Sequence, residues 1–366
     1  MIKNLLVLAV SSVVTLAAGE VAVRVLLKDQ TVMFPRYHTD YQYGRYTLRG
    51  VRPNAEFRHA SVDGSWTFVT NSRGFRDRRE FDYAKPAGTL RVLSLGDSHT
   101  QGYEVRQQAT FSAVLERALA RRGLRAEVLN AGVSGYSTAE ALAFLENEGY
   151  RFQPDVVVLG FYANDFEDNL KAGLFSLEDG RLVERKFEHL PGVKLQNLIY
   201  AVPGVQWLGE NSYLYSLAFN GVWSLFKTAL ASKAGGALEY AVATQEAAGA
   251  RESALAAALV ERMRAFCESR GMRLIVVDIP RVGAEGRGLA SLPAGLLPGV
   301  EVVTSDELLG DFNGVAEVHV AHGHRHISEF THALIGAELG RRIASRQSNP
   351  TAATSTVRTG ANSRAE

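Results

Sequence analysis

A serine in the stretch Arg91 to Gly102, RVLSLGDSHTQG, has the surroundings of a catalytic nucleophile. Residues 91–95 are a short apolar run that predicts a buried strand. Residues 97–100 predict a turn, and a helical pattern follows over about 107–122. Ser98 is therefore expected where a strand ends and a helix begins, which is where ligands bind in an open α/β sheet. Because Asp and Ser are ordinary turn and cap residues, Ser98 taken alone could simply be a helix N-cap.

Two later loops carry groups that could stabilise an oxyanion. The first contains Asn130-Ala-Gly-Val-Ser-Gly135 and follows a predicted strand at 126–129, and the second contains Ala163-Asn164-Asp165 and follows a predicted strand at 156–161. Parallel strands would deliver Ser98, Gly135 and Asn164 to one edge of the sheet. Acyl transfer through a serine needs hydrogen-bond donors aimed at the oxygen of the tetrahedral intermediate. The backbone N–H groups of Ser98 and Gly135 and the side-chain amide of Asn164 are suitable donors.

A cluster of histidines near the C-terminus could supply the general base. Five of the nine histidines lie within the 14 residues from His319 to His332. A serine hydroxyl is a poor nucleophile until a base accepts its proton, and imidazole suits this task at neutral pH. One of these histidines is therefore expected to activate Ser98.

These stretches, taken in order, resemble the SGNH (GDSL) hydrolase family. The resemblance rests on Gly-Asp-Ser-His-Thr-x-Gly, Asn-Ala-Gly-x-Ser-Gly, Ala-Asn-Asp and a histidine just before the last helix, and it covers about residues 89–345 less an insertion. It implies a serine nucleophile at Ser98, oxyanion donors at Ser98, Gly135 and Asn164, and a catalytic histidine at His326. It also implies ester hydrolysis without a cofactor.

The chain departs from the family pattern at two positions. The family usually has glycine two residues before the oxyanion asparagine, where this chain has Tyr162. More seriously, the family places an aspartate three residues before its histidine, and position 323 is glycine. That aspartate normally orients the imidazole and stabilises its charged form. The alternatives for this role are Glu317, Asp278, His324 or a backbone carbonyl, and the sequence leaves the choice open.

The order of predicted elements gives an α/β fold. Strands and helices alternate from residue 91 to 161 and again from 251 to 345, which predicts a parallel sheet covered on both faces. The resemblance implies a flavodoxin-like three-layer α/β/α sandwich. The expected division is a membrane anchor or signal (1–27), a surface stalk and small β-hairpin element (28–88), the hydrolase domain (89–345) and a disordered tail (346–366). No residue of the β-hairpin element is expected to be catalytic.

The segment 170–249 interrupts the alternation and is predicted to be an insertion. It contains a hairpin pattern around Glu178-Asp-Gly180, then an aromatic stretch over 196–230, and then an alanine- and glycine-rich link. The aromatic helices could form a lid over the substrate, a patch lying on the membrane, or an extra packed layer.

The N-terminus predicts an attachment to a membrane. Lys3 precedes a charge-free run from Asn4 to Gly19, and Glu20 and Arg24, one helical turn apart, interrupt further apolar residues. The continued apolar pattern favours an uncleaved anchor, and a cleaved signal peptide is the alternative. With Lys3 inside, the rest of the chain would face the periplasm or cell exterior.

Composition limits the other partners. The net charge of +1 and the lack of a basic stripe give no reason to expect a nucleic acid. The single cysteine, Cys267, excludes an internal disulfide and a cysteine-based zinc site.

Two rival functions remain. His322, His324 and His326 alternate and could hold a metal such as zinc, although no acidic or cysteine ligand accompanies them at motif spacing. The missing aspartate also allows an inactive protein that binds glycan. The favoured prediction is a membrane-anchored serine ester hydrolase acting on acyl groups, chiefly O-acetyl, of carbohydrate or lipid, with acyl transfer to polysaccharide as the alternative.

Overall fold

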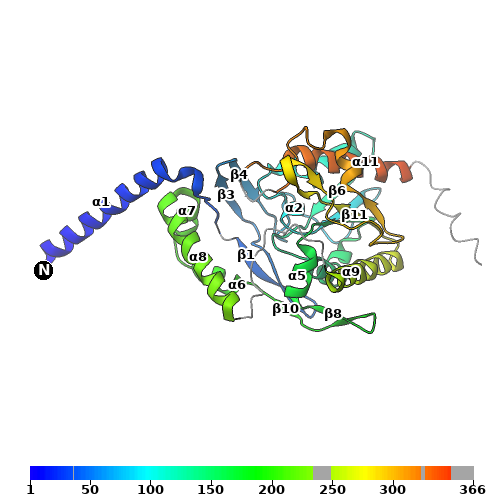
Figure 1. Cartoon of the computed structure of the whole chain (residues 1–366), viewed down its shortest axis with the longest axis horizontal. Coiled ribbons are helices and arrows are strands. Elements are labelled where there is room, and N and C mark those ends of the chain that lie inside the picture. Colours follow the sequence, from blue (N-terminus) through cyan, green and yellow to red (C-terminus); the bar gives the residue numbers. More distant parts are fainter. Residues whose placement is uncertain (36, 234–248, 323–325, 348–366) are drawn as a thin grey trace, which may run out of the picture.

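Five parallel strands form the centre of the computed structural model, which describes residues 1–35, 37–233, 249–322 and 326–347 (Figure 1). The strands are β5 (Leu90–Leu95), β6 (Ala126–Asn130), β7 (Val156–Phe161), β11 (Arg273–Asp278) and β14 (Glu301–Val303). Their order across the sheet is β6-β5-β7-β11-β14, and every pairing is parallel. This is the 2-1-3-4-5 order of flavodoxin-like folds. The predicted α/β fold with a parallel sheet is therefore confirmed.

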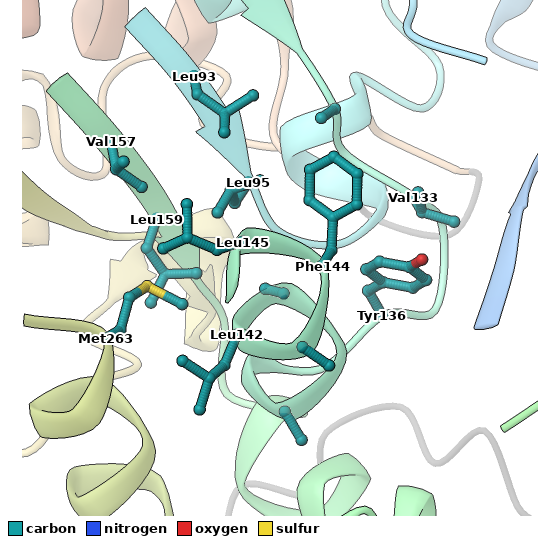
Figure 2. Packing of buried hydrophobic residues seen from close by; sticks show 14 of the residues in the cluster. Leu93, Leu95, Val133, Tyr136, Leu142, Phe144, Leu145, Val157, Leu159 and Met263 are labelled. Atoms are coloured by element: carbon teal, nitrogen blue, oxygen red, sulfur yellow. The ribbon is translucent and has the colours of Figure 1, made fainter. Parts of the chain in front are cut away.

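Helices cover both faces of this sheet because its strands are apolar on both sides. On one face α3 (Phe111–Ala120) and α11 (Glu329–Gln347) pack over residues such as Val92 and Val158. On the other face α4 (Thr138–Asn147), α5 (Asp165–Ala172) and α9 (Ala250–Ser269) pack over residues such as Leu95 and Leu159. Figure 2 shows the second layer, where Leu142, Leu145 and Met263 meet the strand side chains.

One close backbone contact fixes the loop after β6 against the short helix α2 (Ser98–Gln101). A Cβ at Gly132 would lie 2.4 Å from the backbone nitrogen of Gln101 and 2.8 Å from the carbonyl carbon of Thr100. Real Cβ atoms do not come this close to backbone, so only glycine fits at this position. The loop that carries Gly135 is thereby held against the helix that carries Ser98.

We predict that Gly132→Ala lowers the free energy of unfolding by about 1–3 kcal/mol, the usual cost of forcing a methyl group into packed structure. Urea unfolding followed by circular dichroism measures this change. Gly123→Ala is not an ideal control because its φ is positive, so Ala265→Gly on the exposed side of α9 provides the comparison, with a cost of about 1 kcal/mol. A Gly132→Ala protein as stable as the wild type would contradict the close contact.

The N-terminal β region is more ordered than the sequence predicts. Instead of an irregular stalk, residues 38–51 form an antiparallel hairpin of β1 (His38–Tyr43) and β2 (Tyr46–Val51). Tyr37, Tyr46 and Leu48 are almost completely buried. The prediction of a surface stalk was wrong because the tyrosine hydroxyl groups suggest a polar surface segment, whereas the tyrosine rings bury a large apolar area. The second predicted hairpin is present as β3 (Glu56–Ser61) and β4 (Gly64–Val69).

The predicted insertion contains both strands and helices. The hairpin around Glu178-Asp-Gly180 is β8 (Phe175–Glu178) and β9 (Arg181–Glu184), and β10 (Glu188–His189) pairs with β2. Three helices follow: α6 (Val193–Tyr200), α7 (Val205–Asn211) and α8 (Tyr213–Lys233). The alanine- and glycine-rich link over 234–248 and the tail from 348 lie outside the described residues. The remaining short elements are β12 (Arg281–Val282), β13 (Gly288–Leu289) and α10 (Ser305–Leu309).

A long apolar helix, α1 (Ile2–Leu26), begins the chain and projects away from the sheet (Figure 1). It has a mean hydropathy of 2.1 over an 18-residue window and is almost entirely exposed. The helix is long and apolar enough to cross a membrane, a test that a signal sequence near the N-terminus would also pass.

Candidate active site

Ser98 is the first residue of α2, directly after β5. The Asp97 side chain accepts a hydrogen bond from the backbone N–H of His99 at 2.8 Å and so caps the helix, and Gly102 ends it in a left-handed conformation. The predicted turn is therefore a single helical turn. Its caps hold the Ser98 side chain at the carboxyl end of β5, beside the switch point between β5 and β7 where the strand order reverses.

His326 lies next to this serine. Its Nε2 atom is 2.8 Å from Ser98 Oγ, which is a good hydrogen-bond distance. The imidazole lies among aromatic rings, with ring centroids 4.7 Å from His99 and 4.6 Å from Tyr103. The side chain is only 12% exposed. The structure thus brings together the serine and the histidine that the sequence selected as nucleophile and base.

A carboxylate that the sequence analysis did not consider lies behind the histidine. Glu104 Oε2 is 3.7 Å from His326 Nδ1, on the side of the ring opposite to Ser98. This distance is an ion-pair separation rather than a hydrogen bond, and catalytic contacts in unliganded sites often tighten only when substrate binds. The Glu104 side chain is completely buried. It occupies the place that the family's aspartate would take, although it lies only six residues after Ser98.

The neighbours of Glu104 keep it ionised. Burial alone would raise its pKa, but the interactions with His326 and His59 hold that pKa well below its usual range. His59 comes from strand β3, and its Nε2 atom is 3.7 Å from Glu104 Oε1. Ser61, on the same strand, donates a hydrogen bond to that oxygen at 3.3 Å. The β3–β4 hairpin, from which no catalytic contribution was expected, therefore supports the buried Glu104 carboxylate.

The backbone at Glu104 is unusual for a residue with a side chain. Its φ is +59°, in the left-handed region that non-glycine residues seldom adopt. Such conformations persist where the surrounding structure enforces them, and they cluster at functional sites. The sequence signal that could have found this residue is an isolated acid between Tyr103 and Val105, immediately after the serine block.

The two carboxylates named from the sequence have other contacts. Asp278 accepts hydrogen bonds from the backbone N–H groups of Ser291, Leu292 and Ser305, at 2.8, 3.0 and 3.1 Å, and so ties loops at the end of β11. Glu317 is exposed. None of the contacts recorded for Asp278 or Glu317 involves His326. His324, the third alternative, lies outside the described residues.

Gly135 and Asn164 follow β6 and β7 at the same edge of the sheet as Ser98. Gly135 has a φ of +78°, and the Arg49 guanidinium donates a hydrogen bond to its carbonyl oxygen. Asn164 precedes α5, and its side-chain nitrogen donates to Asp168 Oδ2 at 2.9 Å. An amide nitrogen carries two N–H donors, so this contact uses one of them.

The other histidines of the cluster have separate environments. His322 is exposed and lies 3.0 Å from Asp63 on the β3–β4 turn. His332 is buried, and its Nδ1 atom accepts a hydrogen bond from the backbone N–H of Phe111 at 3.0 Å. Burial, followed by the nearby Arg76 charge, lowers the pKa of His332 to about 3, so this ring is neutral. Within the described ranges, which omit 323–325, no group of three or more His, Cys, Asp or Glu residues is placed to hold a metal.

Three acids at the starts of α2 and α5 have raised pKa values. Burial, together with the Asp168 charge, raises the pKa of Asp97 to about 7. Burial likewise raises the pKa of Asp168 to about 6, and the pKa of Asp165 is raised well above its usual value. These carboxyl groups therefore take up protons more readily in the folded protein than in the unfolded chain.

This proton uptake predicts a pH dependence of stability. The folded-state pKa of Asp97 lies above its unfolded value, so the folded state binds more protons and its stability falls as pH rises from about 4 to 7. Asp97→Asn is always neutral and keeps an oxygen for the His99 N–H. We predict that this variant loses less stability than the wild type between pH 5 and pH 8 in urea unfolding. Equal losses in the two proteins would show that Asp97 does not titrate in this range.

Comparison with known protein families decides the class of the molecule. A family model described as "GDSL-like Lipase/Acylhydrolase family" matches residues 94–297, which is more than half of the 366 residues. The chain belongs to this family. The match includes Ser98, Glu104, Gly135 and Asn164, whereas His326 lies beyond its end. No curated protein sequence matches the chain.

Several solved structures are similar to the chain at low identity. A lipase/acylhydrolase from Enterococcus faecalis is 18% identical over 70% of this chain and 96% of its own, with a TM-score of 0.39. A two-domain esterase active on acetylated mannans is 14% identical over 72% of this chain and 52% of its own, with a TM-score of 0.37. A Geobacillus acetyl-xylooligosaccharide esterase is 13% identical over 70% of this chain and 94% of its own, with a TM-score of 0.37.

Proposed function

We propose that this GDSL-family protein is a serine ester hydrolase with a Ser98–His326–Glu104 triad. The observation that carries the proposal is the alignment of three groups: His326 Nε2 lies 2.8 Å from Ser98 Oγ, and the buried Glu104 carboxylate faces the other ring nitrogen at 3.7 Å. A nucleophile, a base and a group that orients the base are the parts that acyl transfer through serine requires.

In the proposed reaction, Ser98 Oγ attacks the ester carbonyl while His326 Nε2 takes the hydroxyl proton. The ionised Glu104 stabilises the resulting imidazolium and keeps the Nδ1–H directed toward itself. The tetrahedral oxyanion accepts hydrogen bonds from the backbone N–H groups of Ser98 and Gly135 and from the second N–H of the Asn164 amide. His326 then returns its proton to the leaving alcohol. Water attacks the acyl-enzyme with His326 again as base, which releases the acid and restores Ser98.

We propose that the substrates are acyl esters, chiefly O-acetyl groups, of carbohydrate or lipid outside the cytoplasm. The support for this location is the apolar helix α1, which is long and apolar enough to cross a membrane. We propose that α1 is retained as an anchor with Lys3 on the cytoplasmic side. The sequence resemblance supports the reaction class, and an exported member of such a family suggests acyl groups of envelope or secreted polysaccharide as substrates. The mechanism needs no metal or organic cofactor.

The test uses the full chain in detergent with a fluorophosphonate probe and a short-chain chromogenic ester. We expect covalent labelling of Ser98, located by peptide mass spectrometry, together with ester turnover that the probe abolishes. Acetylated xylan, acetylated mannan and phospholipid vesicles then separate carbohydrate from lipid substrates. A folded protein that turns over no ester and takes up no probe would contradict the proposed hydrolase. Labelling without hydrolysis, followed by acyl transfer to an added glycan, would instead identify an acyltransferase.

A further inference from the structure

The helices α6 to α8 expose an apolar surface in an unusually uncharged part of the chain. Between residues 195 and 226 the only charged side chain is that of Glu210. Five large apolar side chains of this segment are more than half exposed: Leu198, Val202, Trp207, Val222 and Leu225. Single exposed apolar residues are ordinary on a protein surface, but a group of them without charges marks an interaction site. We call residues 195–225 the platform.

Helix α8 presents its apolar stripe outward. Ala218, Gly221, Val222 and Leu225 follow the i, i+3, i+4, i+7 spacing of one helix face, and all four are exposed. On the opposite side Ser216 is buried, and the Phe219 ring stacks at 5.9 Å on that of Trp223. A helix at an aqueous surface would normally carry polar residues on its outer face. The outer face of α8 is therefore suited to an apolar environment.

The platform is joined directly to the apolar helix α1. The Glu20 carboxylate accepts hydrogen bonds from Ser212 Oγ at 2.8 Å and from the backbone N–H groups of Tyr213 and Leu214 at 3.0 Å each. These contacts cap the first turn of α8. Arg24, paired with Glu20 at 2.6 Å, also donates to the Asn211 carbonyl oxygen at 2.6 Å. The last turns of α1 and the start of α8 thus form one hydrogen-bonded junction.

The position of this junction along α1 places the platform at a membrane surface. Residues 2–19 are free of charge apart from Lys3 and, at 1.5 Å per residue, extend about 27 Å, close to the hydrocarbon thickness of a bilayer. If α1 spans, Glu20 and Arg24 lie at the boundary between lipid tails and headgroups. In Figure 1, α1 projects away from the rest of the chain. Helix α8 starts beside the C-terminal end of α1 and runs across the direction of α1. A helix arranged in this way would run along the membrane rather than through it.

We propose that the platform lies in the interface of the lipid leaflet next to the Glu20 end of α1, with Trp207, Val222 and Leu225 inserted at the headgroup boundary. The occupant is lipid because α8 is hydrogen-bonded to the last turns of α1, so an α1 that spans a bilayer holds the exposed apolar face of α8 beside the lipid. Aromatic side chains, such as that of Trp207, are favoured at this depth. The proposal goes beyond ester hydrolysis and requires α1 to be retained in the membrane.

This contact would set the orientation of the proposed active site. The Gln206 side chain of α7 donates to the Glu56 carbonyl oxygen at 3.1 Å, and Arg58 donates to the Glu210 carbonyl oxygen at 2.9 Å. Both bonds join the platform to strand β3, which carries His59 against Glu104. In this arrangement the platform connects the bilayer to the strand that supports Glu104, the carboxylate proposed to position His326.

The experiment measures where single spin labels lie in the full chain reconstituted in phosphatidylcholine–phosphatidylglycerol vesicles. Cysteines replace Val222 or Leu225 on the platform, Val10 in α1, or Ala265 on the exposed side of α9 as the matched helical control. The native Cys267 is buried and does not compete for the label. Power saturation compares collisions with oxygen, which concentrates in lipid, and with a nickel chelate, which remains in water.

We expect the oxygen-to-nickel ratio at 222 and 225 to exceed that at 265 severalfold and to lie below that at 10, because position 10 is near the centre of the bilayer and the platform is at its headgroup boundary. Ratios at 222 and 225 equal to that at 265, with position 10 in lipid, would overturn the proposal while leaving α1 as an anchor. Protection of 222 and 225 from both reagents would also overturn it, because a second copy or another protein would then cover the platform. An aqueous signal at position 10 would remove its premise. Ester turnover, measured on each labelled protein, reports separately on the proposed hydrolase.

Discussion

Replacing Ser98 with alanine is expected to reduce ester turnover by a factor on the order of 10⁶, the loss seen when a serine hydrolase loses its nucleophile. In the proposed mechanism the hydroxyl oxygen forms the acyl-enzyme bond, and among the described residues no other group is placed on His326 Nε2 to replace it. The backbone of α2 and its Asp97 cap remain, so the fold should be unchanged. Steady-state kinetics on a chromogenic ester and circular dichroism measure the two effects.

The control for this prediction is Ser269→Ala on the exposed end of α9, which should retain full activity. His326→Ala should cost nearly as much as Ser98→Ala, and the double variant little more than either, because residues that act as one unit are not additive. Additive losses in the double variant would mean that Ser98 and His326 do not act together. A larger loss at His322 or His332 would identify a different base.

Replacing Glu104 with glutamine should lower kcat by a factor on the order of 10⁴, with little change in KM. The variant keeps the shape of the side chain but removes the charge that stabilises the His326 imidazolium. Its amide group could also donate to Nδ1 and favour the wrong tautomer of the ring. Glu104 contacts the base rather than the reacting atoms, so the loss should fall on kcat. Kinetics at several substrate concentrations separate the two parameters.

The matched control is Glu317→Gln, which changes an exposed carboxylate that the sequence alone made a candidate for the same role. It should behave as the wild type. Equal activities of Glu104→Gln and the wild type would show that the site works as a dyad. Loss of activity at Glu317 instead would show that the buried contact between Glu104 and His326 is not the one used in catalysis.

His59 supports Glu104 from β3 and offers a graded test of this arrangement. His59→Asn removes the imidazole 3.7 Å from Glu104 Oε1, and with it an interaction that lowers the pKa of the Glu104 carboxylate. The acidic limb of the pH–rate profile should then move to higher pH, because Glu104 would protonate more readily. Burial alone would raise the pKa of Glu104, so removing the His59 imidazole should produce a shift that the pH–rate profile can detect. An unchanged profile would limit His59 to packing.

Local patterns in the chain were sufficient to predict the sheet and the three loops at its edge. Apolar runs at 91–95, 126–129 and 156–161 correspond to β5, β6 and β7, and the alternation of strand and helix predicts that the sheet is parallel. The flavodoxin-like arrangement was implied by the family resemblance. Ser98 could be selected because a strand, a glycine and a helix surround it in sequence. These features depend on neighbours within a few residues, which a sequence displays directly.

The tyrosine-rich β1–β2 hairpin and the role of Glu104 were not predictable in this way. Tyr37 and Tyr46 are buried because β1 and β2 pack on the main domain, a contact between distant segments that no local period reveals. Glu104 resembles any surface carboxylate in the sequence. Its burial depends on β3, some 45 residues earlier, and on His326, more than 200 residues later. The family pattern pointed instead to position 323, where this chain has glycine.

The sequence by itself determined the family and the parallel sheet and selected Ser98 as the candidate nucleophile, because these follow from short motifs and apolar periodicity. The tertiary structure decided which carboxylate faces His326, how the β3–β4 hairpin supports that carboxylate, and where the aromatic helices meet α1. The reason is physical. An ion pair between buried groups depends on a separation of a few ångströms, and that separation is set by the packing of segments far apart in the chain.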